Sequence, residues 1–378
     1  MSKNFNVLVF IDWYYPAFKA GGPIRSISNM ISLLSKDIHF FIVTGDRDLL
    51  DANPFKGITF NSWLKKENYS IIYLNKTSRR KSNYKKLYND VQPNCVYVNG
   101  VFSYDFSIKP LLTFNKTNAK LIVSPRGMFG LNSLKVKPLK KKIFLFLMNA
   151  MDKYSNVLWH LNSNKELIEL KSKINKIKEN TILPNLSLLP IDLPKGHSKK
   201  EKKLNLISIC RVLPIKNIHF LIKVLKNVQF QCQYNIIGPI EDNMYYQSCL
   251  DLINQLPNNV HVHFLNQVKP ENILQNLNEA DLFVSTSLNE NFGHSIVEAL
   301  GFYKPVLISD QTPWKNLLNY KAGADVSLVE QDFLFHLNKF ANMSNDEYQS
   351  YSKGAKSYFD QFMNPNLFKD RYIDLLTN

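Results

Sequence analysis

Two glutamates stand eight residues apart in the stretch NENFGHSIVEALG, which covers residues 289–301. The apolar run 281–286 before it predicts a buried strand, and the residues after Gly293 have the pattern of a helix. Glu290 would then lie in the loop at the end of the strand, and Glu298 in the early helix. Carboxylates bind hydroxyls, and the backbone amides at a helix start bind phosphate. The pattern predicts a ligand with hydroxyls at both ends and phosphates between them, such as a nucleotide sugar. The alternative is two ordinary surface glutamates.

Two cations follow another predicted strand in the second half of the chain. Arg211 and Lys216 lie in CRVLPIKN, directly after the apolar run 204–209. Positive charge at the end of a strand suits a pyrophosphate. Gly238 ends the next apolar run, where a residue without a side chain lets the backbone approach a ligand closely. Each signal is common by itself, so the prediction rests on their combination.

Three loops in the first half also carry candidate residues. Gly21 and Gly22 precede a helical pattern, where they could bring backbone amides to an anion or simply begin the helix. Asp46 and Asp48 form a D-x-D, which can hold a divalent cation but more often shapes a loop. Arg126 in SPRGMFG could contact a phosphate or an acceptor, or form a surface ion pair. A G-x-G-x-x-G fingerprint is absent, so a nicotinamide or flavin cofactor is not supported.

Apolar runs alternate with amphipathic ones along the whole chain, which is typical of a parallel sheet covered by helices on both faces. Because ligands bind beyond the carboxyl ends of such strands, the loops above are where chemistry is expected. Ser163 and Glu166 predict a capping box at a helix start. Two further segments predict helices, 22–36 and 138–154. The predicted strands are 5–11, 38–44, 70–74, 95–99, 120–124, 156–161, 204–209, 232–238, 260–265, 281–286 and 304–310.

The alternation breaks once, at a segment rich in proline and lysine. We therefore expect two α/β domains, residues 1–185 and 204–360, joined by a linker at 186–203. Residues 361–378 predict a closing helix. The four cysteines lack metal or redox spacing and predict reduced, packed thiols.

The net charge of +16 is concentrated in the first half. Residues 1–190 carry 29 Lys and Arg against 12 Asp and Glu, a balance of +17, whereas 191–378 carry 18 against 19. This asymmetry predicts an anionic partner: acidic lipid, a phosphorylated substrate or nucleic acid. The basic segments 65–86 and 135–142 are candidates for contact with a membrane surface, the second because it leads into an apolar helical stripe. A solvated basic surface is the simpler alternative.

Taken together, these motifs resemble the retaining glycosyltransferases of family 4, which have the GT-B fold. The resemblance covers nearly the whole chain and includes DWYYPAFKAGGPIRS, SPRGMF, the Arg211/Lys216 pair, IIGP and ENFGHSIVEALGFYKPV followed by TPW. It implies two Rossmann-like, doubly wound domains facing a central cleft. The chain departs from the family pattern in its loops. Arg126 stands where many relatives have His, Asn185-Leu186 stands where they have Asn-Gly before the linker, and Cys210 stands where they have Gly.

The resemblance also implies roles for these residues. Arg211 and Lys216 would hold the donor diphosphate, Glu290 would position the sugar, and Glu298 would bind the ribose hydroxyls. Arg126 and Asp48 would contact acceptor or phosphate. The implied donor-binding residues are Gly21, Gly22, Gly238, Asn291, Phe292, Gly293, His294 and Glu298.

The implied reaction moves a hexose-type sugar from a nucleotide diphosphate sugar, UDP rather than GDP, to a hydroxyl of a lipid-linked or oligosaccharide acceptor. It would retain the anomeric configuration and need neither metal nor cofactor. The setting would be the assembly of capsule, O-antigen or other lipopolysaccharide, in the cytoplasm on the inner face of a bacterial membrane. One alternative is a sugar-nucleotide 2-epimerase on the same plan, and a second is a nucleic-acid-binding protein, which no recognised motif supports.

Overall fold

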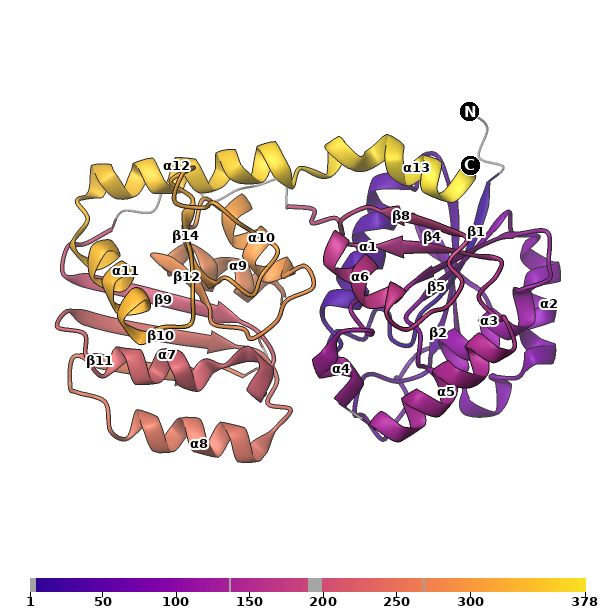
Figure 1. Cartoon of the computed structure of the whole chain (residues 1–378), viewed down its shortest axis with the longest axis horizontal. Helices are drawn as coiled ribbons and strands as arrows, with labels where there is room; N and C mark the ends of the chain where they lie inside the picture. Colours follow the sequence, from indigo (N-terminus) through magenta and orange to yellow (C-terminus); the bar gives the residue numbers. More distant parts are fainter. Residues whose placement is uncertain (1–4, 136, 190–198, 267, 269) are drawn as a thin grey trace. The chain divides into compact units, whose positions relative to one another are not determined.

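The computed structural model describes residues 5–135, 137–189, 199–266, 268 and 270–378. The chain divides into two compact units. Unit 1 comprises Met1–Leu186 and Pro365–Asn378, and unit 2 comprises Ser187–Asn364. The chain therefore leaves unit 1 once, builds unit 2, and returns to unit 1 for its last residues (Figure 1).

Unit 1 contains an eight-stranded sheet in the order β3-β4-β2-β1-β5-β6-β7-β8. Its neighbouring strands are parallel except for β3 and β4, which pair antiparallel. The strands are β1 (Asn6–Phe10), β2 (His39–Gly45), β3 (Leu64–Lys65), β4 (Tyr69–Leu74), β5 (Cys95–Asn99), β6 (Lys120–Ser124), β7 (Val157–Leu161) and β8 (Glu179–Ile182). All six strands predicted for this part of the chain are confirmed. The additional strands β3 and β8 lack an apolar run: β3 has two residues and β8 is ENTI.

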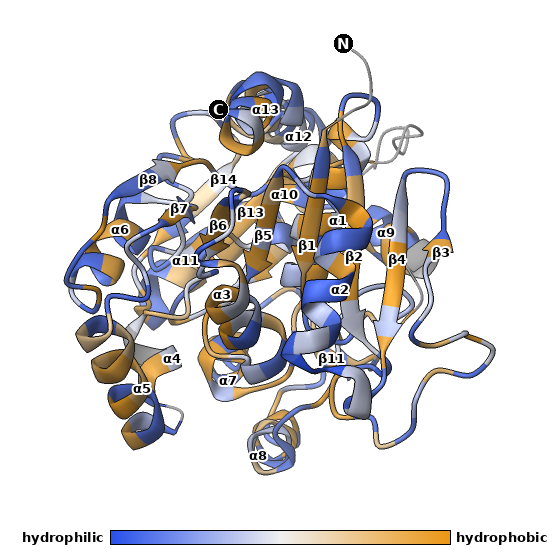
Figure 2. Cartoon of the chain, turned by 90° about the vertical axis from the view of Figure 1, so that its right-hand side faces the viewer, coloured by the Kyte–Doolittle hydropathy of each residue, from blue (hydrophilic) through white to orange (hydrophobic). Residues whose placement is uncertain are grey.

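Helices cover both faces of this sheet, as the parallel strands require. Side chains of β1 alternate between two cores: Leu8 and Phe10 pack in one, Val7 and Val9 in the other. Figure 2 shows β1 and β2 as mainly hydrophobic and the outer helix α2 as mainly hydrophilic. The helices are α1 (Gly22–Leu34), α2 (Lys81–Val91), α3 (Lys109–Phe114), α4 (Leu131–Lys135), α5 (Pro138–Ala150), α6 (Asn164–Lys171) and α13 (Lys369–Thr377), with short turns η1 (Lys76–Ser78), η2 (Tyr104–Ile108) and η4 (Pro365–Phe368).

The Ser163 half of the predicted capping box at α6 is confirmed, whereas the Glu166 carboxylate reaches the amide of Asn162 and not that of Ser163. The Ser163 side chain accepts a hydrogen bond from the amide of Glu166 at 3.2 Å. The buried Glu166 carboxylate accepts one from the amide of Asn162 at 2.6 Å and another from Gly127 in the loop after β6. Burial raises the pKa of Glu166, and the two amides and Arg126 oppose this. The cap therefore also fixes the SPRGMFG loop.

Unit 2 contains a six-stranded, all-parallel sheet in the order β11-β10-β9-β12-β13-β14. The five strands predicted for this half are confirmed, and β14 is additional. The strands are β9 (Lys203–Ile209), β10 (Gln231–Ile237), β11 (Val260–Phe264), β12 (Leu282–Ser285), β13 (Val306–Ser309) and β14 (Gly323–Val326). The helices are α7 (Ile218–Leu225), α8 (Asn243–Ile253), α9 (Pro270–Glu279), α10 (His294–Gly301), α11 (Glu330–Asn342) and α12 (Asn345–Phe362), with the turn η3 (Pro214–Lys216).

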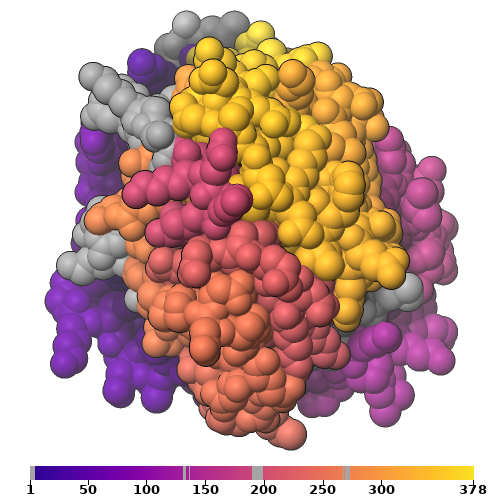
Figure 3. Space-filling model, turned by 90° about the vertical axis from the view of Figure 1, so that its left-hand side faces the viewer, coloured from indigo at the N-terminus to yellow at the C-terminus, as the bar shows by residue number. Residues whose placement is uncertain are grey.

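Two cores also flank the sheet of unit 2. One contains apolar residues of α7, α8 and α11, and the other those of α9, α10 and α12. The segment that enters β9 packs on the end of α11 and the start of α12: the Lys202 amide donates to Ala341 O at 3.0 Å, and the Lys199 amide to Asn345 Oδ1 at 3.2 Å. This contact is visible in Figure 3, where the pink segment borders the yellow helices.

The chain crosses between the units twice, and both crossings differ in detail from expectation. Of the predicted linker 186–203, residues 190–198 lie outside the described residues, and Lys203 already belongs to β9. The predicted closing helix 361–378 is two elements, since α12 ends at Phe362 and α13 begins at Lys369. Pro365 explains the break, because a proline disfavours helical geometry at the residue before it.

Every helix within the described residues is too short or too polar to cross a lipid bilayer. All four cysteines carry free thiols, and Cys95, Cys232 and Cys249 are buried.

Candidate functional site

The predicted donor residues of unit 2 lie in loops at the carboxyl edge of three adjacent strands. The sheet order places β9 between β10 and β12. The strand order reverses between β9 and β12, and such a switch point opens a crevice where ligands of doubly wound sheets bind. Arg211 follows β9, Gly238 follows β10, and Glu290 follows β12.

Lys216 and Glu290 form an ion pair between two of these loops. Lys216 Nζ donates to Glu290 Oε1, and Ser287 Oγ donates to the same oxygen at 2.9 Å. The two charged side chains are only 16% and 15% exposed, so solvent screens their attraction partly. The structure thus brings together two residues that the sequence indicated separately.

Hydrogen bonds to backbone carbonyls hold these two loops together. Lys216 ends the short turn η3, and Asn217 then adopts a left-handed conformation with φ 54°. Thr286 Oγ1 donates to Asn217 O at 2.9 Å, and the Leu288 amide donates to Ile215 O at 2.8 Å. Ser309 Oγ of β13 donates to Ser287 O at 2.6 Å. The pair is therefore positioned by three strands.

Arg211 pairs with Glu241, a residue that the sequence analysis missed. Arg211 Nη1 lies 3.0 Å from Glu241 Oε2 and 3.2 Å from Oε1. The Arg211 side chain is 42% exposed, so its guanidinium remains accessible to a ligand. Glu241 is the second residue after IIGP, and its position in the loop after β10 was the available signal.

Gly238 brings the loops after β9 and β10 into contact. A Cβ at this position would lie 1.9 Å from the carbonyl oxygen of Cys210, and φ is +149°. Only glycine fits this approach. Burial raises the pKa of the neighbouring Cys210 to about 11, although Lys216 and Arg211 oppose the rise. Cys210 is therefore a neutral thiol near neutral pH.

The segment before α10 contains Phe292, which follows Asn291 and packs against Trp314. Trp314 Nε1 donates to Phe292 O at 2.6 Å, and their rings lie 5.2 Å apart. Gly293 caps α10, and His294 Nδ1 lies 3.1 Å from Ser187 Oγ. Glu298 lies half-buried on the same helix. Trp314 comes from the TPW motif, whose contact with Phe292 was not predicted.

In unit 1, Asp48 shapes the loop that carries Gly21 and Gly22. Its Oδ2 accepts hydrogen bonds from the amides of Phe18 at 2.9 Å and Lys19 at 3.3 Å, and its Oδ1 from Leu49 at 2.7 Å. These bonds agree with the loop-shaping alternative. Gly21 precedes α1 with φ +63°.

The guanidinium of Arg126 donates hydrogen bonds to three side chains of unit 1. Its Nε donates to Asn99 Oδ1 at 2.7 Å, its Nη2 to Tyr97 OH at 3.0 Å, and its Nη1 to Asn185 Oδ1. Tyr97 OH lies 2.6 Å from His160 Nδ1, and burial lowers the pKa of His160 to about 3. A phosphate or acceptor at Arg126 would have to replace some of these bonds.

Within the described part of the chain, no group of three or more His, Cys, Asp and Glu residues is arranged to hold a metal ion. The acids of the D-x-D are occupied by protein contacts: Asp46 pairs with Arg47 and Arg79, which keep its pKa low despite burial.

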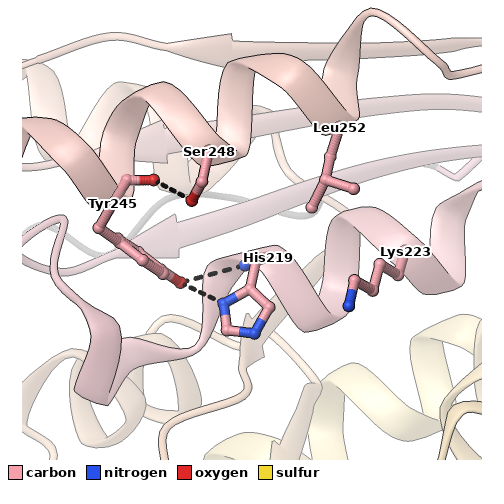
Figure 4. Close-up of a pocket in the computed structure, with 5 residues that line it drawn as sticks. All are labelled: His219, Lys223, Tyr245, Ser248 and Leu252. Carbon is pink, nitrogen blue, oxygen red and sulfur yellow. Dashed lines mark hydrogen bonds between the residues drawn. The ribbon is translucent and has the colours of Figure 1, made fainter.

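A separate surface pocket lies between α7 and α8 (Figure 4). It is lined by His219, Lys223, Tyr245, Ser248 and Leu252. Tyr245 OH lies 3.0 Å from His219 Nδ1 and accepts a hydrogen bond from the His219 amide at 3.1 Å. None of the predicted site residues lines this pocket.

With this geometry established, the comparison with known families is decisive for unit 2. Residues 191–321 match the family described as glycosyl transferases group 1. This segment is a glycosyltransferase domain. It contains Arg211, Lys216, Gly238, Glu290 and Glu298, so the donor residues predicted for unit 2 lie inside the matched region. No curated protein matches the chain.

Solved structures share the fold of the whole chain at low identity. HepE (Alr3699) of Anabaena, in a complex with UDP and glucose, has a TM-score of 0.73 at 14% identity and covers 99% of both chains. Sucrose-phosphate synthase of Thermosynechococcus elongatus has a TM-score of 0.72 at 13% identity, covering 98% of this chain and 97% of that chain. WaaG, a glycosyltransferase of lipopolysaccharide biosynthesis, has a TM-score of 0.69 at 13% identity, covering 99% and 100%. The predicted fold of two Rossmann-like domains, as in GT-B glycosyltransferases, is confirmed.

Proposed function

We propose that this glycosyltransferase moves a hexose-type sugar from a nucleotide diphosphate sugar to a hydroxyl of a lipid-linked or saccharide acceptor, with retention of configuration. The observation that carries the proposal is the Lys216–Glu290 pair at the switch point of unit 2, inside the matched domain. UDP is the preferred nucleotide in this proposal, because HepE was solved with UDP-glucose and a trehalose-6-phosphate enzyme with UDP-2-fluoro glucose.

The chemistry assigned to each residue follows from where charge develops. As the bond from the sugar to the diphosphate breaks, negative charge accumulates on the departing oxygens. Fixed cations directed at this charge stabilise the transition state more than the ground state. Lys216 and the accessible Arg211 are the cations placed for this role. Glu290, oriented by Lys216 and Ser287, would bind sugar hydroxyls.

Binding of the nucleotide would exchange existing ion pairs for new ones. Lys216 and Arg211 each have a carboxylate partner, Glu290 and Glu241. A diphosphate competes for the same cations, while the freed carboxylates can accept hydrogen bonds from hydroxyls. The cations are therefore held in position before the donor binds, which lowers the cost of ordering them. Glu298 on α10 is proposed for the ribose hydroxyls.

Nucleotide binding and turnover test the proposal. Thermal-shift measurements with UDP, GDP and their glucose and mannose derivatives should identify a ligand that raises the melting temperature by mass action. Product analysis by NMR then distinguishes transfer from the 2-epimerase alternative. Formation of an epimer from the nucleotide sugar alone, without an acceptor, would contradict a transferase, and retention is read from the anomeric coupling of the product.

We also propose that unit 1 rests on an anionic membrane through α5. The outer side of this helix exposes Leu139, Ile143, Phe146 and Leu147, with exposed fractions between 49% and 70%. Figure 2 shows α5 with hydrophobic and hydrophilic residues interspersed. Exposed lysines flank the stripe at 135, 137, 140 and 142. Each would add about 1 kcal/mol near an acidic surface. The alternative segment 65–86 is less suited, since its Arg79 is paired with Asp46.

Cosedimentation with phosphatidylcholine vesicles, with and without phosphatidylglycerol, tests this contact. The protein should bind only the anionic vesicles, and salt should release it. Phe146→Glu should abolish binding, whereas Phe335→Glu, at the 65% exposed Phe335 of α11, should not. Equal binding to both kinds of vesicle would contradict the proposal.

A further inference from the structure

Unit 1 has its own switch point, and one aspartate lies beside it. The sheet order β2-β1-β5-β6 reverses direction between β1 and β5. Asp12 follows β1, and Ser103 follows β5. Ser103 Oγ donates to Asp12 Oδ1 at 2.5 Å, so the two loops meet through this carboxylate.

The charged residues around Asp12 are paired with one another. Arg79 Nη2 donates to Asp46 Oδ1 at 2.7 Å, and Lys109 Nζ donates to Asp105 Oδ1 at 2.6 Å. Asp12 differs, because no lysine or arginine within the described residues forms an ion pair with it. Its second oxygen, Oδ2, accepts no hydrogen bond from another described side chain. The fold thus keeps a carboxylate that has no ion-pair partner among the described residues at the place where doubly wound sheets bind ligands.

Exposed aromatic rings follow both residues closely in the chain, one in the loop after β1 and one at the start of η2. Tyr15 follows Asp12 and is 41% exposed, and Tyr104 follows Ser103 and is 67% exposed. Aromatic surface combined with a few placed polar groups is typical of small-ligand sites. A carboxylate oxygen accepts hydrogen bonds and repels anions, so a ligand rich in hydroxyl groups suits this chemistry.

We propose that Asp12 accepts a hydrogen bond from a hydroxyl of a saccharide acceptor and positions that acceptor on unit 1. This assignment rests on the proposed glycosyl transfer, since it names a residue for the second substrate. It involves hydrogen bonding alone, with no proton transfer. Ser103 fixes the carboxylate, and Oδ2 faces the hydroxyl as an acceptor.

The ionisation of Asp12 gives the interaction a pH dependence. Burial raises the pKa of Asp12 to about 6, with Asp105 adding to the rise, whereas the Ser103 hydrogen bond and Arg79 lower it. Tyr84 also faces this group, and its own pKa is raised by burial. Below about pH 6 the carboxyl becomes protonated and loses its charge. Saccharide affinity should therefore fall as the pH drops from 7 to 5.

The test measures two ligands separately on the full chain, by saturation-transfer NMR and calorimetry. The probes are a panel of p-nitrophenyl α- and β-hexosides for the acceptor and UDP for the donor. Asp12→Asn presents an amide donor where the carboxylate presents an acceptor. It should weaken hexoside binding at least tenfold and leave the UDP dissociation constant within twofold. Lys216→Ala should weaken UDP binding and leave hexoside binding unchanged. Asp90→Asn, on the exposed side of α2, should change neither affinity.

The pH profile separates ligand binding from a structural role. Removing the hydrogen bond that lowers the pKa of Asp12 raises that pKa, so Ser103→Ala should move the acidic loss of hexoside binding to higher pH. The Ser103→Ala variant keeps the carboxylate of Asp12, so it tests the proposal even if Asp12→Asn does not fold. Wild-type protein that binds none of the hexosides, or unchanged binding and pH profile in both variants, would overturn the assignment. Failure of UDP binding alone would instead contradict the proposed donor site.

Discussion

Lys216 and Glu290 lie 74 residues apart in the sequence and share one short contact in unit 2. Removing either charged side chain leaves the other without its partner in this ion pair. At the scale of single residues, the pair should therefore behave as one unit rather than as two additive contributions.

Lys216→Ala and Glu290→Ala should each lower the rate of transfer at least a hundredfold, which corresponds to about 2.7 kcal/mol of transition-state stabilisation. The double variant should lose little more than either single variant, because residues that act as a unit are not additive. Steady-state turnover with the donor identified by thermal shift measures this. Lys356→Ala, which removes the Lys356–Asp360 pair on α12, is the control. Near-normal turnover in both single variants would reject the site.

Lys304 gives a second prediction at this scale. It is 2% exposed, and its Nζ donates to Asn278 O at 2.7 Å and Ala280 O at 2.8 Å. Burial lowers the pKa of Lys304 to about 8. Its ordinary value is about 10.4, so the unfolded chain binds more protons than the folded one between these two values. The free energy of unfolding should thus rise as pH increases through that window.

Urea unfolding of wild type and Lys304→Met between pH 7 and 9.5 tests this effect. The methionine variant has no group that titrates at this position. The free energy of unfolding of the wild type should therefore increase relative to that of the variant as pH rises. A constant difference across the range would show that Lys304 keeps its ordinary pKa in the fold.

At the scale of elements, close backbone contact between the loops after β9 and β10 depends on Gly238. An alanine there would place its Cβ 1.9 Å from Cys210 O, and neither backbone segment can rotate away as a flexible side chain would. At Gly21 φ is also positive, at +63°, but a Cβ would meet nothing within 4 Å. An alanine at Gly238 therefore tests steric overlap, whereas an alanine at Gly21 tests backbone strain alone.

Gly21→Ala should cost about 1–3 kcal/mol, the strain of a backbone with φ 63° and ψ −111°, which residues other than glycine rarely adopt. Gly238→Ala should cost more than about 4 kcal/mol, which is exceptional for one substitution. Hydrogen exchange resolved along the chain is the suitable measurement, because each glycine belongs to a different unit. Equal and small losses at both positions would contradict the assigned overlap.

The sequence predicted elements where the apolar signal was strong and failed where it was weak. Buried parallel strands such as β5 and β6 are continuous apolar runs, and both were predicted with their observed bounds. The strand β8 is polar at an edge of the sheet, so no periodicity marks it. The same holds for the site: Arg211 was recognisable from its loop, but its partner Glu241 required the pairing of β9 with β10 to be known.

At the scale of the whole molecule, the last residues of the chain belong to the unit where the chain begins. Tyr372, Leu375 and Leu376 of α13 are buried in the core that contains β1 and α1. Tyr372 OH donates to Pro184 O at 2.9 Å, and Lys120 Nζ donates to Leu375 O at 2.8 Å. The C-terminal helix is thus part of the core of unit 1, although it follows unit 2 in the sequence.

Deleting residues 365–378 should destabilise unit 1 and spare unit 2. Burial of one large apolar side chain contributes about 1.5–3 kcal/mol, so losing three removes about 5–9 kcal/mol from unit 1, comparable with the stability of a whole domain. Hydrogen exchange should show lost protection in β1 and α1 and unchanged protection in β9 and β12. Tyr372→Phe, which removes only one hydrogen bond, should cost about 1 kcal/mol. Because UDP is proposed to bind unit 2, the truncated chain should still bind it, and a parallel loss of UDP binding and of protection in β9 would show that the two units do not fold independently.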